Sequence, residues 1–227
     1  MADIIRLQNI NKVYGDKIKT QVLFNIDLGF REHSFNSIIG SSGSGKSTLM
    51  NILGTLDRPT SGNVLVRGQK TTAMTKNQIA RFRNETIGFI FQFHYLLPEY
   101  TALENVLLPA RILGKVTEQT RERAKSLIDL VGLTPVMNNM SANMSGGQQQ
   151  RTAIARALIN QPDNILADEP TGNLDSNTTE SIYKLLRQIN AEKKTTFIII
   201  THDNRIAEKA DRIVEIKDGR IGLDLRS

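Results

Sequence analysis

The stretch of this sequence that most restricts its possible folds lies at residues 40–48. It reads Gly-Ser-Ser-Gly-Ser-Gly-Lys-Ser-Thr and fits the pattern G-x-x-x-x-G-K-[ST]. An apolar run typical of a strand precedes it at residues 35–39, and a helical pattern follows at residues 46–53. Glycines between a strand and a helix let backbone N–H groups turn toward phosphate oxygens, and the helix N-terminus adds a partial positive charge. The stretch therefore predicts a phosphate-binding loop within an α/β fold.

All nine residues of this loop are predicted to bind nucleotide: Gly40, Ser41, Ser42, Gly43, Ser44, Gly45, Lys46, Ser47 and Thr48. The Lys46 ammonium can reach the β- and γ-phosphates, and the Ser47 hydroxyl can bind Mg²⁺. The alternative is a glycine- and serine-rich loop without a ligand. Average composition produces this pattern in fewer than about 1 in 100 chains of this size, so phosphate binding is the stronger interpretation.

Two adjacent carboxylates follow another apolar strand pattern at residues 165–167. Asp168 and Glu169 come directly after it, so a buried strand would place both beside the phosphate-binding loop. Asp168 is predicted to hold Mg²⁺, usually through water, and Glu169 to orient or deprotonate the attacking water. The alternative is a strand that ends in a solvated acidic turn, which the phosphate-binding loop in the same chain disfavours. These two motifs do not separate a transport ATPase from a kinase or a small GTPase.

The whole chain, residues 1–227, reads as one α/β domain without internal repeats. Several apolar runs are solid blocks rather than alternating patterns, which indicates strands buried on both faces of a mainly parallel sheet. The predicted strands are residues 4–7, 22–28, 35–39, 64–66, 87–91, 165–167, 197–200 and 213–216. The predicted helices are residues 46–53, 117–131, 145–160 and 176–192. Residues 102–150 have little strand pattern, which predicts a helical subdomain.

Composition excludes several classes of protein. Hydrophobic residues make up 39% of the chain and charged residues 23%, as in an ordinary globular domain. Cysteine is absent, so neither disulfides nor thiolate metal sites form. No apolar run approaches the roughly 20 residues of a membrane-spanning helix, and residues 1–6 lack the apolar region of a signal peptide. The net charge of +6 includes no block of five like charges, so a slightly basic surface is favoured over nucleic-acid binding.

A third motif separates the remaining classes of phosphate-binding protein. It reads Met-Ser-Gly-Gly-Gln-Gln-Gln-Arg over residues 144–151. Ser145 is predicted to cap the amphipathic helix that follows, and the Ser-Gly-Gly turn forms a second helix N-terminus suited to anions. Capping alone does not account for the two glycines and the Arg-Ala-Leu farther along the helix. With this motif, the sequence resembles the ATPases of ABC transporters from end to end, with Met144 where leucine is usual.

The resemblance assigns roles to further residues. It implies nucleotide contacts by the signature loop, which comprises Ser145, Gly146, Gly147 and Gln148. Gln92 resembles the glutamine that senses Mg²⁺ and the γ-phosphate, and His202 resembles the switch histidine. Tyr14 stands where the family places an aromatic ring on adenine, and residues 173–175 resemble the D-loop. Taken singly, Tyr14 and His202 would read as packing or capping residues, but their order and spacing together favour the family interpretation.

The family's chemistry, carried onto these positions, is hydrolysis of ATP to ADP and phosphate with Mg²⁺. The implied catalytic residues are Glu169, His202 and Gln92. The implied Mg²⁺ ligands are Ser47, Gln92 and Asp168. The resemblance also implies a homodimer in which Ser145 and Gly147 of one copy complete the site of the other.

Three segments resemble one branch of the family, the lipoprotein-release and macrolide-export type (LolD/MacB-type): residues 56–62, 91–106 and 167–175. This branch implies a P-loop core with an N-terminal antiparallel β piece and a helical subdomain over about residues 93–160. It implies a chain at the cytoplasmic face of the membrane that drives a separate permease by ATP-dependent closure, with a periplasmic or extracellular adaptor as a further partner and no nucleic acid. The aromatic and apolar run after Gln92 predicts permease docking over residues 93–111.

Three alternatives from other classes remain open. A soluble ABC protein acting on ribosomes or DNA would use the basic charge, but such proteins usually carry two fused ATPase units or a long coiled coil. A P-loop kinase would lack the Ser-Gly-Gly-Gln loop at residues 145–148. An ABC ATPase that transmits a mechanical signal without moving a substrate would carry the same motifs as a transporter subunit.

Overall fold

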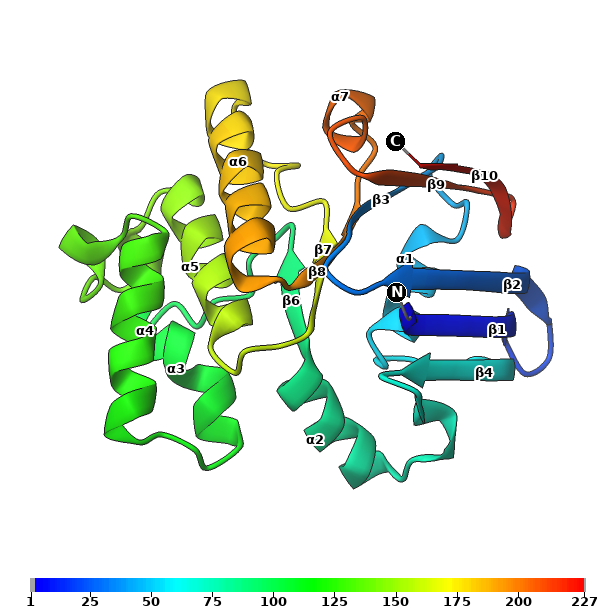
Figure 1. The fold of residues 1–227 in the computed structure, drawn as a ribbon, viewed down its shortest axis with the longest axis horizontal. Coiled ribbons are helices and arrows are strands. Elements are labelled where there is room, and N and C mark those ends of the chain that lie inside the picture. Colours follow the sequence, from blue (N-terminus) through cyan, green and yellow to red (C-terminus); the bar gives the residue numbers. More distant parts are fainter. Residues whose placement is uncertain (1–2, 227) are drawn as a thin grey trace.

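The computed structural model describes residues 3–226, which form a six-stranded and a four-stranded β-sheet with helices around them (Figure 1). Residues 1, 2 and 227 of the predicted single domain lie outside this range. The strands are β1 (Asp3–Tyr14), β2 (Thr20–Arg31), β3 (Phe35–Ile39), β4 (Ser61–Val66), β5 (Gln69–Lys70), β6 (Ile87–Phe91), β7 (Asn164–Asp168), β8 (Thr196–Ile200), β9 (Arg212–Lys217) and β10 (Arg220–Arg226). The α-helices are α1 (Lys46–Leu53), α2 (Lys76–Thr86), α3 (Ala102–Ile112), α4 (Glu118–Leu130), α5 (Gly146–Leu158), α6 (Ser176–Lys193) and α7 (Asn204–Ala207).

The six-stranded sheet forms the centre of the fold, with the strand order β10-β9-β3-β8-β7-β6. All neighbouring strands in it are parallel except β10 and β9. β7 and β8 are almost entirely buried because apolar clusters cover both faces of the sheet. The prediction of a mainly parallel sheet from solid apolar runs is therefore confirmed. Phe91 pairs with Asp168, and Asp168 pairs with Ile200, so the carboxyl ends of three strands meet at one edge.

The four-stranded sheet is antiparallel, with the order β2-β1-β4-β5, and confirms the predicted antiparallel piece. It is larger than predicted, because β1 and β2 each extend over 12 residues. Ile5 and Leu7 from β1 belong to one apolar cluster with Leu49 from α1. The same cluster contains Leu166 and Ile198 from the six-stranded sheet. Helix α1, which follows the phosphate-binding loop, is therefore held by contacts with both sheets.

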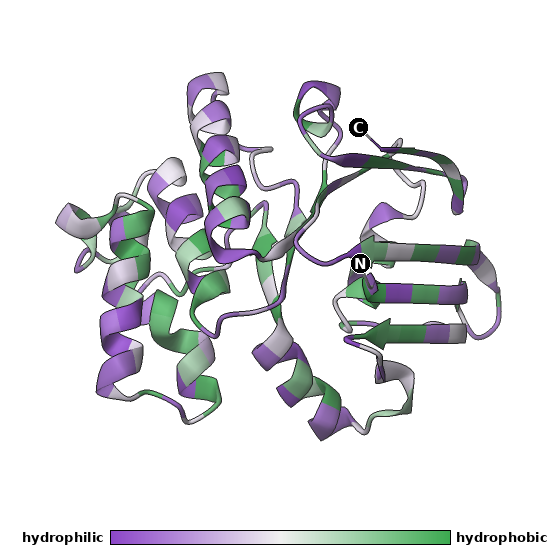
Figure 2. Cartoon of the chain, viewed as in Figure 1, coloured by the Kyte–Doolittle hydropathy of each residue, from purple (hydrophilic) through white to green (hydrophobic). Residues whose placement is uncertain are grey.

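Helices α3, α4 and α5 gather at the left of the molecule in Figure 1. Figure 2 shows hydrophobic and hydrophilic residues alternating around them, as expected for helices that bury one face. In α4 the buried face includes Ala124, Leu127 and Ile128, as its periodicity predicts. No strand of either sheet lies between β6 and β7, although the division of residues 93–160 into a separate subdomain stays a prediction.

The sequence patterns identify α1, α4, α5 and α6 to within two residues at either end. They miss the short elements β5 and α7 as well as α2 and β10, and they cover α3 only as part of the helical stretch at residues 102–150. Helix α2 begins with a capping box formed by Thr75 and Gln78, yet most of its residues are polar, so its apolar periodicity is weak. Strand β10 lies at a sheet edge, and a register shift between Ile221 and Leu223 interrupts its alternation. None of the helices among residues 3–226 combines the length and hydropathy that crossing a bilayer requires.

Candidate active site

The phosphate-binding loop connects β3 to α1 and depends on three glycines with positive φ. Gly40, Gly43 and Gly45 have φ angles of 153°, 77° and 106°, which residues with a Cβ atom rarely adopt. A Cβ atom at Gly40 would lie 2.2 Å from the Ile216 carbonyl oxygen, and one at Gly45 would lie 2.9 Å from Leu23 Cδ2. At Gly40, glycine is therefore required for space as well as for conformation, whereas at Gly45 the clash would be with the end of a leucine side chain.

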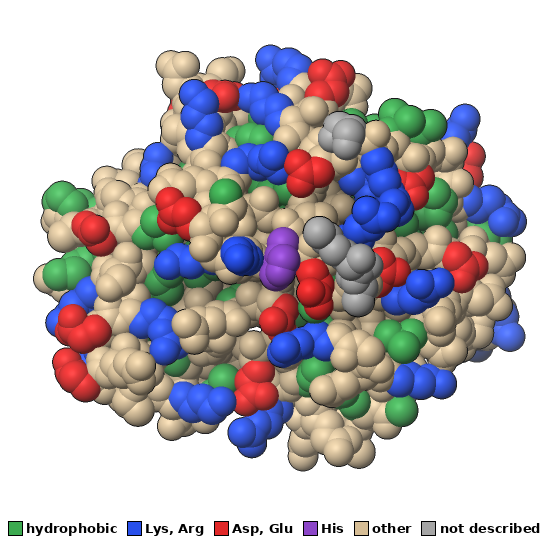
Figure 3. Space-filling view, in the orientation of Figure 1, with side chains coloured by type: hydrophobic (Ala, Val, Ile, Leu, Met, Phe, Trp, Pro, Cys, Tyr) green, Lys and Arg blue, Asp and Glu red, His purple; other side chains and the backbone are tan. Residues whose placement is uncertain are grey.

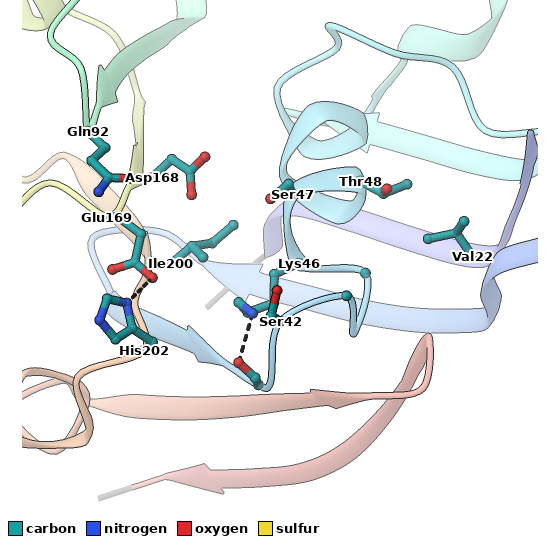
Figure 4. Close-up of a pocket in the computed structure, with 13 residues that line it drawn as sticks. Val22, Ser42, Lys46, Ser47, Thr48, Gln92, Asp168, Glu169, Ile200 and His202 are labelled. Carbon is teal, nitrogen blue, oxygen red and sulfur yellow. Dashed lines mark hydrogen bonds and ion pairs between the residues drawn. The ribbon is translucent and has the colours of Figure 1, made fainter. Parts of the chain in front are cut away.

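A cavity of about 490 Å³ opens in front of this loop (Figure 4). It is lined by Val22, Gly40, Ser42, Gly43, Gly45, Lys46, Ser47, Thr48, Gln92, Asp168, Glu169, Ile200 and His202. The sheet edge where parallel strands end brings these segments together, as is usual for ligand sites in α/β folds. Two predicted loop residues do not line the cavity, because Ser44 is buried beneath the loop and Ser41 is exposed outside it.

Lys46 folds back onto the loop that carries it. Its Nζ donates a hydrogen bond to the Gly40 carbonyl oxygen at 2.7 Å (Figure 4) and another to that of Ser41 at 2.8 Å. These bonds keep a positive charge at the mouth of the loop, beside the N-terminus of α1. The position therefore combines an ammonium with a helix N-terminus, both of which favour a bound anion.

Asp168 and Glu169 lie at the end of β7, across the cavity from Ser47 (Figure 4). Burial raises the pKa of Asp168, the negative charge of Glu169 raises it further, and the Lys46 ammonium opposes this rise. Glu169 has a φ of 45°, a left-handed conformation that is uncommon outside glycine. Its Oε1 lies 2.7 Å from His202 Nδ1, so the structure brings the predicted base and the predicted switch histidine into contact.

Gln92 is bonded reciprocally to a residue of the predicted D-loop. Its Nε2 donates to Asn173 Oδ1 at 3.1 Å, and Asn173 Nδ2 donates to the Gln92 carbonyl oxygen at 3.2 Å. A Cβ atom at Gly172 would lie 2.8 Å from Gln92 Nε2. The turns that follow β6 and β7 are therefore joined at the cavity, and Gly172 leaves room for that contact.

Tyr14 does not line the cavity but is held close to α1 by two residues that the sequence does not point to. The Tyr14 hydroxyl donates to Asp57 Oδ2 at 2.8 Å, and Lys12 donates to Asp57 Oδ1 at 2.7 Å. The Lys12 ammonium also lies 4.6 Å from the centre of the Tyr14 ring. Burial raises the pKa of Tyr14, as does its bond to Asp57, while a hydrogen bond with Thr48 lowers it in part. The ring therefore has a fixed position next to the first turn of α1.

The signature loop caps α5, as predicted. The Ser145 hydroxyl accepts a hydrogen bond from the Gln148 backbone N–H at 3.3 Å, and Gln148 Oε1 accepts one from the Ser145 N–H at 2.9 Å. The predicted site residues Ser145, Gly146, Gly147 and Gln148 are absent from the lining of the cavity around Lys46. Within one chain, the two predicted anion-binding helix N-termini therefore belong to separate surfaces.

Comparison with known proteins shows the family of the chain. The sequence profile of the ABC transporter family matches residues 23–172. The chain belongs to the ABC transporter family. The fold agrees: a solved dimer of the ATP-binding cassette MJ0796, in a post-hydrolysis state bound to ADP and Pi, is 41% identical. That comparison covers 98% of each chain, with a TM-score of 0.88. The protein is therefore an ATPase of this family, and a kinase is excluded.

Curated relatives of this ABC ATPase share nearly its whole length. The lipoprotein-releasing system ATP-binding protein LolD 1 of Rhodopseudomonas palustris is 48% identical over 224 residues, which is 97% of this chain and 99% of the relative. The LolD protein of Shewanella frigidimarina is 46% identical over 95% of this chain and 91% of its own. The branch suggested by the sequence motifs is thus confirmed as the LolD type.

The site of this ABC ATPase gathers most, but not all, of the residues predicted from its sequence. Gln92, Asp168, Glu169 and His202 share one cavity with the P-loop. Tyr14 and the signature loop lie outside that cavity, and their nucleotide contacts stay predictions. Val22 and Ile200 line it without having been predicted, because isolated aliphatic residues in strands carry no sequence signal of a site.

Proposed function

We propose that this ABC ATPase is the ATP-hydrolysing subunit of a lipoprotein-releasing transporter, acting on a separate permease at the cytoplasmic face of the membrane. The observation that carries the enzymatic part is the cavity in which Lys46 and Ser47 face Asp168 and Glu169. The transport part rests on the names of relatives at 46–48% identity over at least 95% of this chain. Those names favour transport over a purely signalling output.

The complete site is proposed to form between two copies of the chain. Ser145 and Gly147 lie outside the cavity of their own chain, at the N-terminus of α5, where backbone N–H groups suit a phosphate. A second copy would bring this surface to the γ-phosphate held by Lys46. The dimeric state of the cassette MJ0796, bound to ADP and Pi, supports this arrangement.

The oxygen atoms around the cavity suit Mg²⁺, which prefers hydroxyl and carboxylate oxygens and keeps several waters. The Ser47 hydroxyl and the Asp168 carboxylate face each other across it (Figure 4). Among residues 3–226 no cluster of three or more His, Asp or Glu side chains could hold a metal without the nucleotide. Ser47, Asp168 and Gln92 are therefore proposed to hold Mg²⁺ with the ATP phosphates, where the ion supplies charge neutralisation.

Hydrolysis is proposed to depend on positioning and charge, as phosphoryl transfer requires. Glu169 orients the attacking water and accepts its proton. His202, 2.7 Å from Glu169 Oε1, holds that carboxylate in place. Lys46 binds the γ-phosphate oxygens through its ammonium. Gln92 connects this chemistry to the segment that follows β6.

Replacing Glu169 with Gln tests the enzymatic proposal. The amide keeps the size of the side chain but cannot accept the proton, so ATP should bind normally while turnover falls by about 100-fold or more. ATP should then hold two copies together, which size-exclusion chromatography with and without ATP would detect. A variant that stays monomeric with ATP and hydrolyses it at the normal rate would contradict both proposed roles.

Permease docking is proposed at a groove of about 450 Å³ between α2, α3, β6 and α5. Its apolar lining includes Leu56, Phe89, Phe91, Tyr95, Leu108 and Ile112. Ile112 is 72% exposed and Tyr95 65% exposed, which is unusual for large apolar side chains that lie together. Within the docking segment predicted at residues 93–111, Tyr95, Leu108 and Pro109 line the groove, whereas Leu96 and Tyr100, two of its predicted anchors, do not. An apolar segment of the permease would match the apolar lining of this groove.

The docking proposal can be tested with Ile112→Ser and, as a matched control, Leu225→Ser. Leu225 lies on β10 and is 52% exposed, outside the lining of the groove. With the permease in membranes, Ile112→Ser should lose permease-dependent stimulation of ATPase activity and retain the basal rate of the isolated subunit. Equal stimulation of both variants by the permease would show that the docking site lies elsewhere.

A further inference from the structure

Helix α5 contains a glutamine whose side chain lies entirely inside the protein. Gln150 has no exposed surface, and its Nε2 donates a hydrogen bond to the Pro170 carbonyl oxygen at 2.6 Å. Its Oε1 has no hydrogen-bond partner. A buried, unpaired amide oxygen costs free energy that a methionine or leucine of similar size would avoid. The bond to Pro170 is therefore the feature that distinguishes glutamine from an apolar residue at this position.

Pro170 belongs to the turn that carries the proposed catalytic base. Glu169 precedes it with a φ of 45°, and a non-glycine residue keeps such a conformation only where its surroundings hold it. The Glu169 N–H donates to the Ile200 carbonyl oxygen at 2.9 Å, and the Gly172 N–H donates to the Glu169 carbonyl oxygen at 3.0 Å. The bond from Gln150 adds an anchor from α5, a different part of the fold from β8, which carries Ile200.

The same helix also anchors the turn after Gln92. Arg156 donates from Nη1 to the Tyr95 carbonyl oxygen and from Nη2 to the His94 carbonyl oxygen, each at 2.6 Å. His94 and Tyr95 both have positive φ angles, of 60° and 49°. Burial lowers the pKa of Arg156 to about 10, which leaves the guanidinium charged at neutral pH.

These contacts link α5 and the two turns into one closed network on one side of the cavity. Gln150 holds the turn after β7, Arg156 holds the turn after β6, and Gln92 and Asn173 join the two turns. The helix that supplies both anchors begins at the signature loop. Helix α5 is therefore bonded directly to the backbone next to Glu169.

We propose that Gln150 is a positioning residue for hydrolysis: by holding the Pro170 carbonyl it fixes the turn that aims the Glu169 carboxylate. The inference rests on the proposed role of Glu169 as the base. Loss of the bond would free the Pro170–Thr171 peptide and misplace the carboxylate, while the P-loop, which holds the nucleotide, would be unchanged. Misplacement of a catalytic group by about 1 Å can cost about 100-fold in rate.

The test compares Gln150→Met with Gln149→Met. Gln149 is the neighbouring glutamine, and it too donates to a backbone carbonyl, that of Ser141 at 2.8 Å. Its side chain also bonds the His94 side chain, but neither contact reaches the turn that carries Glu169. Gln150→Met should lower kcat by about 10- to 100-fold, with the Kd for ATP and the KM within about twofold of the parent values. Gln149→Met should leave kcat within about twofold. Rates are referred to the concentration of ATP-binding sites, so a loss of folded protein does not count as a loss of turnover.

A double substitution separates positioning from a structural role. If Gln150 acts through Glu169, adding Gln150→Met to Glu169→Gln should not slow the residual hydrolysis of radiolabelled ATP any further. Gln150→Leu replaces Gln150→Met where the latter folds poorly. A normal kcat in Gln150→Met, an equal loss in Gln149→Met, or multiplicative losses in the double variant would each overturn the inference. Normal turnover in Glu169→Gln alone would instead overturn the proposed base, whatever Gln150 does.

Discussion

Replacing Lys46 with Ala removes the ammonium of a lysine that lines the nucleotide cavity. In the free chain this ammonium already makes two hydrogen bonds, to the carbonyl oxygens of Gly40 and Ser41. ATP must compete with those bonds for the lysine. The variant therefore loses the phosphate contacts but also escapes the cost of breaking the contacts of the free state.

The two effects set the size of the expected loss. A hydrogen bond to a charged group contributes roughly 1.5–3 kcal/mol, and bonds to phosphate exceed those to neutral carbonyls because both partners carry charge. The net loss for Lys46→Ala is then about the value of one such bond, which weakens ATP binding about 10- to 150-fold. Without the carbonyl contacts in the free state, the expected loss would be larger.

Isothermal titration of Mg²⁺-ATP into Glu169→Gln chains, with and without Lys46→Ala, measures this loss without interference from hydrolysis. Lys70→Ala serves as the control, since Lys70 is exposed on β5, outside the cavity. The affinity for inorganic tripolyphosphate should fall by the same factor as the affinity for ATP, because the lysine contacts only phosphate groups. An unchanged affinity for both ligands would refute the assignment of residues 40–48 as the phosphate-binding loop.

Three further predictions concern residues around the cavity and at the far sheet edge. Tyr14→Ala should weaken ATP binding by about 1–3 kcal/mol through lost stacking and leave tripolyphosphate binding unchanged; an equal loss for both ligands would contradict stacking. Gly172→Ala places a Cβ atom 2.8 Å from Gln92 Nε2, so steady-state kcat should fall about 10- to 100-fold while thermal unfolding changes little. Asp224→Asn should lower the free energy of unfolding in urea by about 1 kcal/mol at pH 7, because Arg212 is nearly buried and would lose a carboxylate bonded at 2.6 and 2.7 Å.

The Asp224→Asn prediction also specifies how the stability difference should change with pH. The hydrogen bonds from Arg212 lower the pKa of Asp224 below its ordinary value, against the opposing effect of burial. The contribution of Asp224 to stability is therefore complete above the pKa of an aspartate in the unfolded chain, about 3.9. It is lost as the pH falls through the lowered pKa of Asp224 in the folded chain. The difference between the parent chain and Asp224→Asn should shrink below about pH 4. A difference that grew on acidification would contradict the ion pair.

Figure 3 shows how the basic residues behind the net charge of +6 are distributed on one face of the molecule. On the face shown, Lys and Arg side chains are interspersed with Asp and Glu rather than gathered in one stripe. Recognition of a nucleic-acid backbone usually requires clustered positive charge on one face or along one helix. The arrangement on this face is that of a solvated surface with an excess of basic residues.

The sequence by itself determined the features that depend on neighbouring residues. The loop at residues 40–48 is a contiguous pattern, since the glycines, Lys46 and the helix start lie within a few positions. The solid apolar runs fixed β7 and β8 as buried strands, and Ser145 fixed the start of α5, because capping and burial act over one turn or one strand. Asp168 and Glu169 were found for the same reason, as they end such a strand.

Only the tertiary structure decided which distant residues meet. Gln92 and Asn173 are 81 positions apart, and no local pattern indicates that they bond to each other. The same holds for Asp57 beside Tyr14 and for Gln150 beneath Pro170, whose polar side chains look like ordinary surface residues in the sequence. Such pairings follow from the order of strands in the sheet and from which face of α5 is buried. Both depend on how all the elements pack together, which a short stretch of sequence does not contain.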